Sequence, residues 1–222
     1  MKRIRLRGFI IVIIICLGFF YYTKNYRENQ LLKKIIARLS ADSRVAEVLV
    51  TEVKFNPATQ KNYTTIKFLE YDAGQKVLPA KYFTFSGNII QFQSMVIRFD
   101  DFYVQKAHPL KGKSAYIFMK AFVLTDKGAE VTEINKVNAI PSGYQVEGAR
   151  NSFEARLWQR LWDYALSGQQ AKKIGVKNAQ IEAPGTKFIP GMLYTIKIEH
   201  DGGLRIDAQP LPLILKDEKV KF

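Results

Sequence analysis

An uncharged apolar segment near the N-terminus constrains this chain more than any other feature of its sequence. Gly8 to Thr23 carries no charge, and four basic residues precede it within residues 1–7. As a helix it would measure about 24 Å, and Arg7 and Lys24 can snorkel to match a ~30 Å hydrocarbon core. Its strongly apolar residues favour insertion by roughly 3–6 kcal/mol in total. We therefore predict a transmembrane anchor over residues 8–23, formed mainly by Phe9, Ile10, Ile11, Val12, Ile13, Ile14, Ile15, Leu17, Phe19 and Phe20.

Two processed forms compete with an uncleaved anchor. A secretory signal peptide needs small residues in an A-x-A-like pattern, and residues 17–30 offer only Gly18 among bulky aromatics. Lipoprotein processing at Cys16 expects a small residue before the cysteine, where this chain has Ile15. We therefore favour an uncleaved signal-anchor in which Cys16, the single cysteine, packs as a small hydrophobe.

The charges around the segment bear on its orientation. Residues 1–44 hold ten basic and two acidic residues, which is more than half of the formal net charge of +14. Because basic residues flank the segment on both sides, the positive-inside count is nearly balanced. A short basic tail ahead of an apolar run is typical of a signal-anchor, and large domains translocate largely regardless of charge. We expect a single-pass membrane protein with a cytoplasmic N-terminus and an extracytoplasmic C-terminal domain.

A second helix is predicted next to the membrane, within residues 24–44. Its apolar residues fall on one stripe at helical spacing, with charges on the other faces. Two interpretations of the stripe remain open: it packs on the chain's own sheet, or it forms a short parallel coiled coil that makes a homodimer through residues 26–43. The stripe consists of Leu32, Ile35, Ile36 and Leu39.

From Val45 onward the apolar residues recur every second position, which predicts strands. We expect strands over residues 45–55, 63–71, 81–85, 88–99, 114–125, 129–135, 193–200 and 204–208. Glycine-containing turns join two of the pairs, namely Asp126-Lys127-Gly128 and Asp201-Gly202-Gly203. This spacing predicts one mostly antiparallel β domain over residues 45–215, either a sandwich or an open barrel. With the helices, the fold class is α+β, and residues 216–222 form a charged tail.

One amphipathic helix interrupts the strands. Asn151 is a suitable N-cap, Glu154 completes a capping-box pattern, and the helix should end near Ser167. Trp158 and Trp162 lie on its wide apolar face. We favour core packing for both rings, and the alternative is a partner or ligand surface.

The sequence contains few residues that could carry catalysis or bind a metal. His108 and His200 belong to no metal-binding pattern, and Asp100-Asp101 point to opposite faces if they lie in a strand. Gly112-Lys113-Ser114 imitates the end of a phosphate loop but lacks the required earlier glycine. We therefore expect no enzymatic activity, no metal and no cofactor.

The remaining function classes follow from location and charge. The chain beyond residue 44 has a net charge of only +6, diluted by eighteen acidic residues, so we expect no nucleic-acid partner. The expected partners are the lipid bilayer and other membrane or envelope proteins. The leading hypothesis is a protein-binding or assembly module of a membrane complex. The alternative is a module that binds an apolar or anionic envelope ligand under the Trp158/Trp162 helix.

Overall fold

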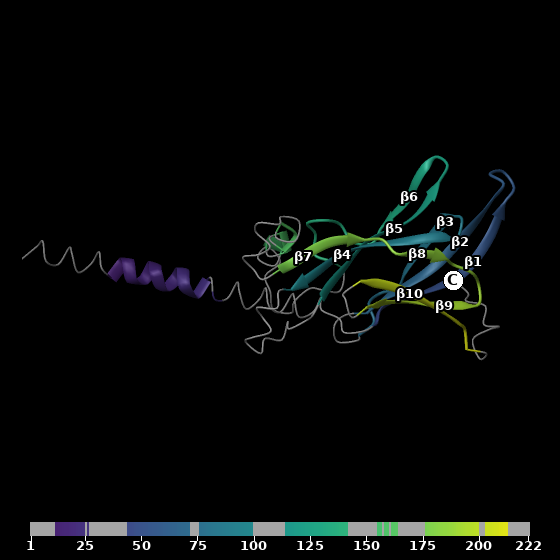
Figure 1. Ribbon diagram of the computed structural model, residues 1–222. Helices are drawn as coiled ribbons and strands as arrows, with labels where there is room; N and C mark the ends of the chain where they lie inside the picture. The colour runs from purple at the N-terminus through teal and green to yellow at the C-terminus, as the bar shows by residue number, and fades with distance from the viewer. Residues whose placement is uncertain are drawn as a thin grey trace, which may run out of the picture.

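The computed structural model consists mainly of two antiparallel β-sheets that face each other (Figure 1). It describes residues 12–24, 26, 44–71, 76–99, 114–141, 155–156, 158–159, 161–163, 176–199 and 203–212. The predicted predominance of antiparallel strands is confirmed. Because the strands form two separate sheets with a shared core, the arrangement is a sandwich.

The first sheet has the strand order β10-β9-β1-β2-β3. Its centre is the long strand β1, which pairs with β2 on one side and with β9 on the other. A bulge between Val50 and Glu52 lets β1 bend along its length. The strands of this sheet are β1 (Arg44–Asn56), β2 (Lys61–Glu70), β3 (Lys81–Ser86), β9 (Met192–Ile198) and β10 (Leu204–Pro210).

The second sheet is built around β4, which pairs with β5 on one edge and with β7 and β8 on the other. β6 continues the sheet beyond β5. Its strands are β4 (Ile89–Phe99), β5 (Ser114–Thr125), β6 (Gly128–Glu133), β7 (Val176–Glu182) and β8 (Gly185–Lys187).

The core between the sheets is aromatic. Phe68 of β2 stacks on Phe92 of β4 with ring centroids 5.4 Å apart, and it meets Phe118 of β5 edge-on at 5.2 Å. These contacts join the two sheets directly, because β2 belongs to the first sheet and β4 and β5 belong to the second. Aromatic pairs of this kind stabilise the fold beyond the free energy gained by burial alone. The other buried members of this core are Ala46, Val48, Val50, Ile66, Phe83, Phe85, Ile90, Val96, Tyr116, Ala121, Val123, Ile134, Phe188, Tyr194 and Ile196.

Polar contacts connect the sheets along one side of the sandwich, where β3 lies next to β6. The ammonium group of Lys81 donates a hydrogen bond to the backbone oxygen of Ile134 at 2.7 Å. Burial lowers the pKa of Lys81, while the charge of Glu70 acts in the opposite direction. Lys81 therefore ties the start of β3 to the end of β6.

The opposite side is connected by hydrogen bonds of two side chains, Glu182 and Tyr194. The Glu182 carboxylate of β7 accepts a hydrogen bond from the backbone N–H of Leu204 in β10 at 2.9 Å. The Tyr194 hydroxyl of β9 donates to the backbone oxygen of Lys187 and accepts from the N–H of Ile189. Each contact runs from one sheet to the other, so both sides of the sandwich are held by hydrogen bonds as well as by apolar packing.

The outer face of the second sheet is also covered over part of its length. Met95 and Ile97 of β4 and Ile117 of β5 alternate with residues of the inter-sheet core, yet they are fully buried. The described residues between 155 and 163 are helical, and Trp158 and Trp162 are buried there as well. The Trp162 indole N–H donates to the backbone oxygen of Ala139 at 3.0 Å, which fixes the helix to the segment after β6.

The predicted strands overlap with eight of the ten observed ones, and β7 and β8 were not predicted. Pro184-Gly185 resembles a turn in the sequence, but Gly185 begins β8 and lies directly against Gln91 of β4. A Cβ atom at Gly185 would lie 3.1 Å from the backbone oxygen of Ile90 and would clash with the Gln91 side chain. This glycine thus permits close strand pairing, as glycine does where two backbones approach each other.

The N-terminal segment is described in part. Residues 12–24 are helical, and all of them except Thr23 are exposed, whereas Phe9, Ile10 and Ile11 lie outside the described residues. The stripe Leu32, Ile35, Ile36 and Leu39, Asn151 and the tail over residues 216–222 lie outside them too. Among the residues that are described, no helix is both long enough and apolar enough to cross a membrane.

We predict that Phe68→Ala lowers the free energy of unfolding by about 3–5 kcal/mol, because it removes a buried ring that three other rings contact. Phe68→Leu retains most of the apolar volume and should cost clearly less. Urea denaturation followed by far-UV circular dichroism measures both. Equal small effects for the two variants would contradict the central role given to this ring.

Candidate functional site

The tips of several hairpins gather at one end of the sandwich. β1 begins at Arg44 and ends at Asn56, so the chain enters the domain about 40 Å from the β1–β2 tip at ~3.3 Å per residue. The β5–β6 tip and the β3–β4 turn lie at this same end (Figure 1). We call it the distal end, because it lies opposite the point where the chain enters the domain.

A cleft opens at the distal end between the β1–β2 and β5–β6 hairpins. It consists of two adjoining pockets of about 440 and 560 Å³. The two pockets have four residues in common: Lys61, Ser86, Thr125 and Asp126. We treat them as one distal cleft, whose size falls within the range of ligand-binding sites.

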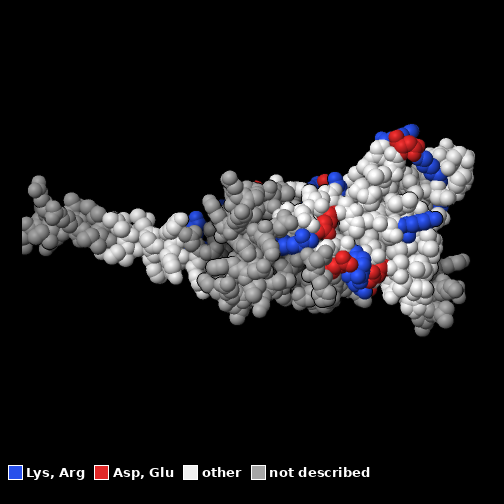
Figure 2. Space-filling model, viewed as in Figure 1, with Lys and Arg blue, Asp and Glu red and all other residues white. Residues whose placement is uncertain are grey.

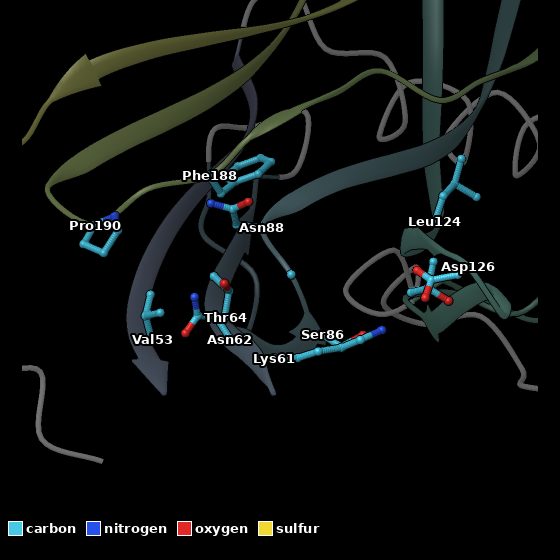
Figure 3. A pocket seen from close by; sticks show the side chains of 12 residues that line it. Val53, Lys61, Asn62, Thr64, Ser86, Asn88, Leu124, Asp126, Phe188 and Pro190 are labelled. Carbon is cyan, nitrogen blue, oxygen red and sulfur yellow. The ribbon is translucent and has the colours of Figure 1, made fainter. Parts of the chain in front are cut away.

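The walls of the cleft come from both sheets. Figure 3 shows Val53, Asn62 and Thr64 of the first sheet on one side and Leu124 and Asp126 on the other. The register places Val53 opposite Thr64, a fully buried position on the inner face of β2. Val53 itself is 44% exposed. The sheets therefore separate at this end, and the inner face of the first sheet becomes accessible.

Local hydrogen bonds fix the two hairpin tips. The Asn56 side chain accepts from the N–H of Ala58 at 2.9 Å, and Gln60 adopts the left-handed conformation with φ of 55°. In the other tip the Thr125 hydroxyl donates to the oxygen of Gly128 and accepts from the N–H of Lys127. Asx and Ser/Thr turns of this kind are encoded locally, so each tip is set by its own sequence.

One contact closes the base of the cleft between the two sheets. The Glu130 carboxylate of β6 accepts hydrogen bonds from both the backbone N–H and the hydroxyl of Ser86, at 2.9 and 2.5 Å. Ser86 ends β3, and Gly87 follows it with φ of 128°, where the chain crosses to the second sheet. Glu130 therefore anchors the crossover point.

The cleft presents amide and hydroxyl groups with two cations and two anions. Asn62, Asn88 and Thr125 supply neutral donors and acceptors, and the charges are carried by Lys61, Lys127, Asp126 and Glu130. Within the described part of the chain, no three histidine, cysteine or acidic side chains cluster in a way that could hold a metal ion. Groups of this kind suit recognition of another polar backbone or side chain by hydrogen bonding.

Exposed apolar side chains lie beside the cleft on the outer face of the second sheet. Leu124 is 68% exposed, Ile89 62% and Val131 46%. The register pairs Phe122 with Gln91 and Val131, and its continuation places Leu124 between Ile89 and Ala129. We call the set Ile89, Phe122, Leu124, Ala129 and Val131 the distal apolar face.

The outer face of the first sheet differs in character. On β9 and β10, Asp207 forms ion pairs with Arg205 and Lys197 at 2.7 and 3.0 Å. The hydrogen bond from Arg205, followed by that from Lys197, holds the pKa of Asp207 below its ordinary value. On the side of the molecule shown in Figure 2, charged side chains form small groups of mixed sign within uncharged surface. Exposed apolar residues in adjacent strands are therefore a distinguishing feature of the distal end.

The residues singled out from the sequence do not form this site. Trp158 and Trp162 are fully buried and line neither pocket, and a binding role for them stays a prediction. His108, His200 and Asp100-Asp101 lie outside the described residues. Sequence reasoning found the Asp126-Lys127-Gly128 turn but not the cleft beside it. Ser86 and Glu130 are 44 positions apart, and no local pattern links them.

The chain was also compared with known proteins. No family model, curated protein or solved structure matches it.

We predict that Glu130→Ala lowers the free energy of unfolding by about 1.5–3 kcal/mol, because Ser86 loses a charged hydrogen-bond acceptor. Glu133→Ala, on the same strand but exposed, is the matched control and should stay within about 0.5 kcal/mol of the parent. Chemical denaturation of the two variants makes the comparison. If both variants had the same stability, the Ser86–Glu130 contact would not hold the crossover.

Proposed function

We propose that this protein is a single-pass membrane protein whose extracytoplasmic β-sandwich binds another envelope protein and so serves as an assembly module. The observation that carries the proposal is the distal apolar face beside the distal cleft. Single exposed apolar residues are ordinary, but a contiguous apolar group is typical of an interaction surface. Here Leu124 and Ile89 are each more than 60% exposed on neighbouring strands.

The membrane part of the proposal rests on the sequence of residues 8–23. Sixteen uncharged residues follow a basic tail, and no small-residue cleavage pattern interrupts them. Apolar side chains of the described helix, such as Ile14 and Phe19, are 62% and 68% exposed, so nothing in the described chain covers them. In a bilayer these side chains contact lipid instead of water, so their exposure on the helix surface carries no free-energy cost.

The position of the distal cleft relative to the start of β1 supports a partner that lies away from the bilayer. β1 begins at Arg44, and the distal cleft lies at the far end of β1. If the chain comes from an anchor before residue 44, the length of β1 separates the cleft from the entry point.

A second site for an apolar ligand beneath Trp158 and Trp162 gains no support from the two pockets, because neither tryptophan lines them.

We predict that the full-length protein stays in the membrane pellet after alkaline carbonate extraction. Replacing Ile13 and Ile14 with arginine should release it, because each arginine costs about 2.5–3.5 kcal/mol near the centre of a transmembrane helix. Immunoblotting of pellet and supernatant gives the answer. Release of the unchanged protein, or a mature N-terminus beyond Thr23, would contradict the anchor.

We further predict that replacing Ile89 and Leu124 together with serine abolishes recovery of the partner when tagged full-length protein is purified from native membranes. Both side chains are mostly exposed, so the thermal melting temperature should change by only a few degrees. Val77→Ser is the matched control, because Val77 is 49% exposed between β2 and β3, where it bridges Tyr71. Retained partner binding by the Ile89/Leu124 variant would exclude the distal apolar face as the interface.

A further inference from the structure

The outer edge of β6 carries backbone groups that the sandwich does not use. The even-numbered residues of β6 point their N–H and C=O groups toward β5, as the bond from the Ile134 N–H to the Met119 oxygen at the end of the strand indicates. Because these groups alternate along a strand, those of Ala129, Val131 and Glu133 point to the opposite side. Among the described residues, these three make no backbone hydrogen bond on that side.

The β6 edge lacks the proline and the basic side chains that lie on or beside other edges. β10 carries the Arg205–Asp207 ion pair and ends at Pro210, and Pro184 separates β7 from β8. Lysine and proline on an edge strand hinder the addition of another strand. β6, with the sequence GAEVTE, contains neither. Its inward-pointing Glu130 is bound to Ser86, which keeps that charge off the free edge.

We infer that the partner adds an extended segment of its own chain as a strand along the outer edge of β6. This inference rests on the proposed function and specifies its partner chemistry. Strand addition gains affinity from main-chain hydrogen bonds and specificity from alternate side chains. The side chains of Ala129 and Val131 lie on the distal apolar face, so the added strand should carry apolar residues at the positions on that face. A basic residue in the segment would complement Glu133.

A second copy of this chain fits the edge less well than a different protein. Antiparallel pairing of two β6 strands in one sheet requires a twofold axis perpendicular to the sheet. That rotation reverses the strand direction, so the entry points of the two copies near Arg44 would lie at opposite ends of the pair. Two copies anchored in one membrane by residues before 44 would be pulled in opposite directions. An extended segment of another protein is free of this constraint.

The test places a photoreactive amino acid at position 131 of the full-length protein and crosslinks it in native membranes. Position 77, comparably exposed between β2 and β3, is the matched control. We expect a crosslink at 131 that exceeds the one at 77 at least tenfold and that maps to one short segment of another protein. A synthetic peptide of that segment should then slow hydrogen exchange of Ala129, Val131 and Glu133 in the purified protein. The same peptide should lose this effect when N-methylated at the amides that face β6.

Every other outcome overturns the inference. A crosslink at 131 no stronger than that at 77 would mean that the edge is unoccupied, and a crosslink to this chain itself would mean a second copy or an intrachain strand. Equal protection by the N-methylated peptide would mean side-chain binding without strand addition. Val131→Lys should abolish partner recovery with unchanged melting. If partner recovery depends on Ile89 and Leu124 but not on Val131, the proposed function stands and strand addition does not.

Discussion

Contact between aromatic rings of the two sheets is the interaction on which this fold depends. Phe68 meets Phe92 and Phe118 across the sandwich from β2, the strand next to the centre of the first sheet. At the side where β8 and β9 meet, Phe188 lies 4.3 Å from the Tyr194 ring and 5.9 Å from Phe92. The rings therefore form a continuous series from β3 to β9, and the positions of the hairpin tips follow from it.

The distal cleft exists because this aromatic packing ends before the strands do. Beyond Phe68 and Ile66, the inner face of β2 continues with the buried Thr64 and the exposed Asn62, whose side chains are smaller than the core rings and leave space toward the second sheet. β1 and β5 nevertheless continue past them to their turns. Each hairpin then keeps its shape through its own turn contacts and its own strand pairing. The cleft is thus a consequence of residue size along β2.

The sequence predicted those parts of the fold that depend on local patterns. Alternating apolar residues identified β2 and β4, and glycine-containing turns identified the β5–β6 and β9–β10 hairpins. β7 was missed because Val176–Glu182 has few apolar residues and gains its strand conformation by pairing with β4. The cleft was missed for a related reason: Lys61, Ser86 and Asp126 are brought together only by the pairing of distant strands. Strand periodicity defines which side chains point inward, but not where the two sheets separate.

The same separation explains why binding groups would concentrate at one end of the sandwich. The covered half of the second sheet, around Met95 and Ile117, is fully buried, whereas two rows further along the same face Phe122 is half-buried and Leu124 is exposed. This face carries apolar residues at both ends, with Gln93 and Lys120 between them, but it is covered at only one end, which leaves apolar area without a partner. Burying that area would release free energy at about 25 cal/mol per Å². The adjoining β6 edge supplies backbone groups that can orient whatever covers it, because main-chain hydrogen bonds are directional and apolar contact is not.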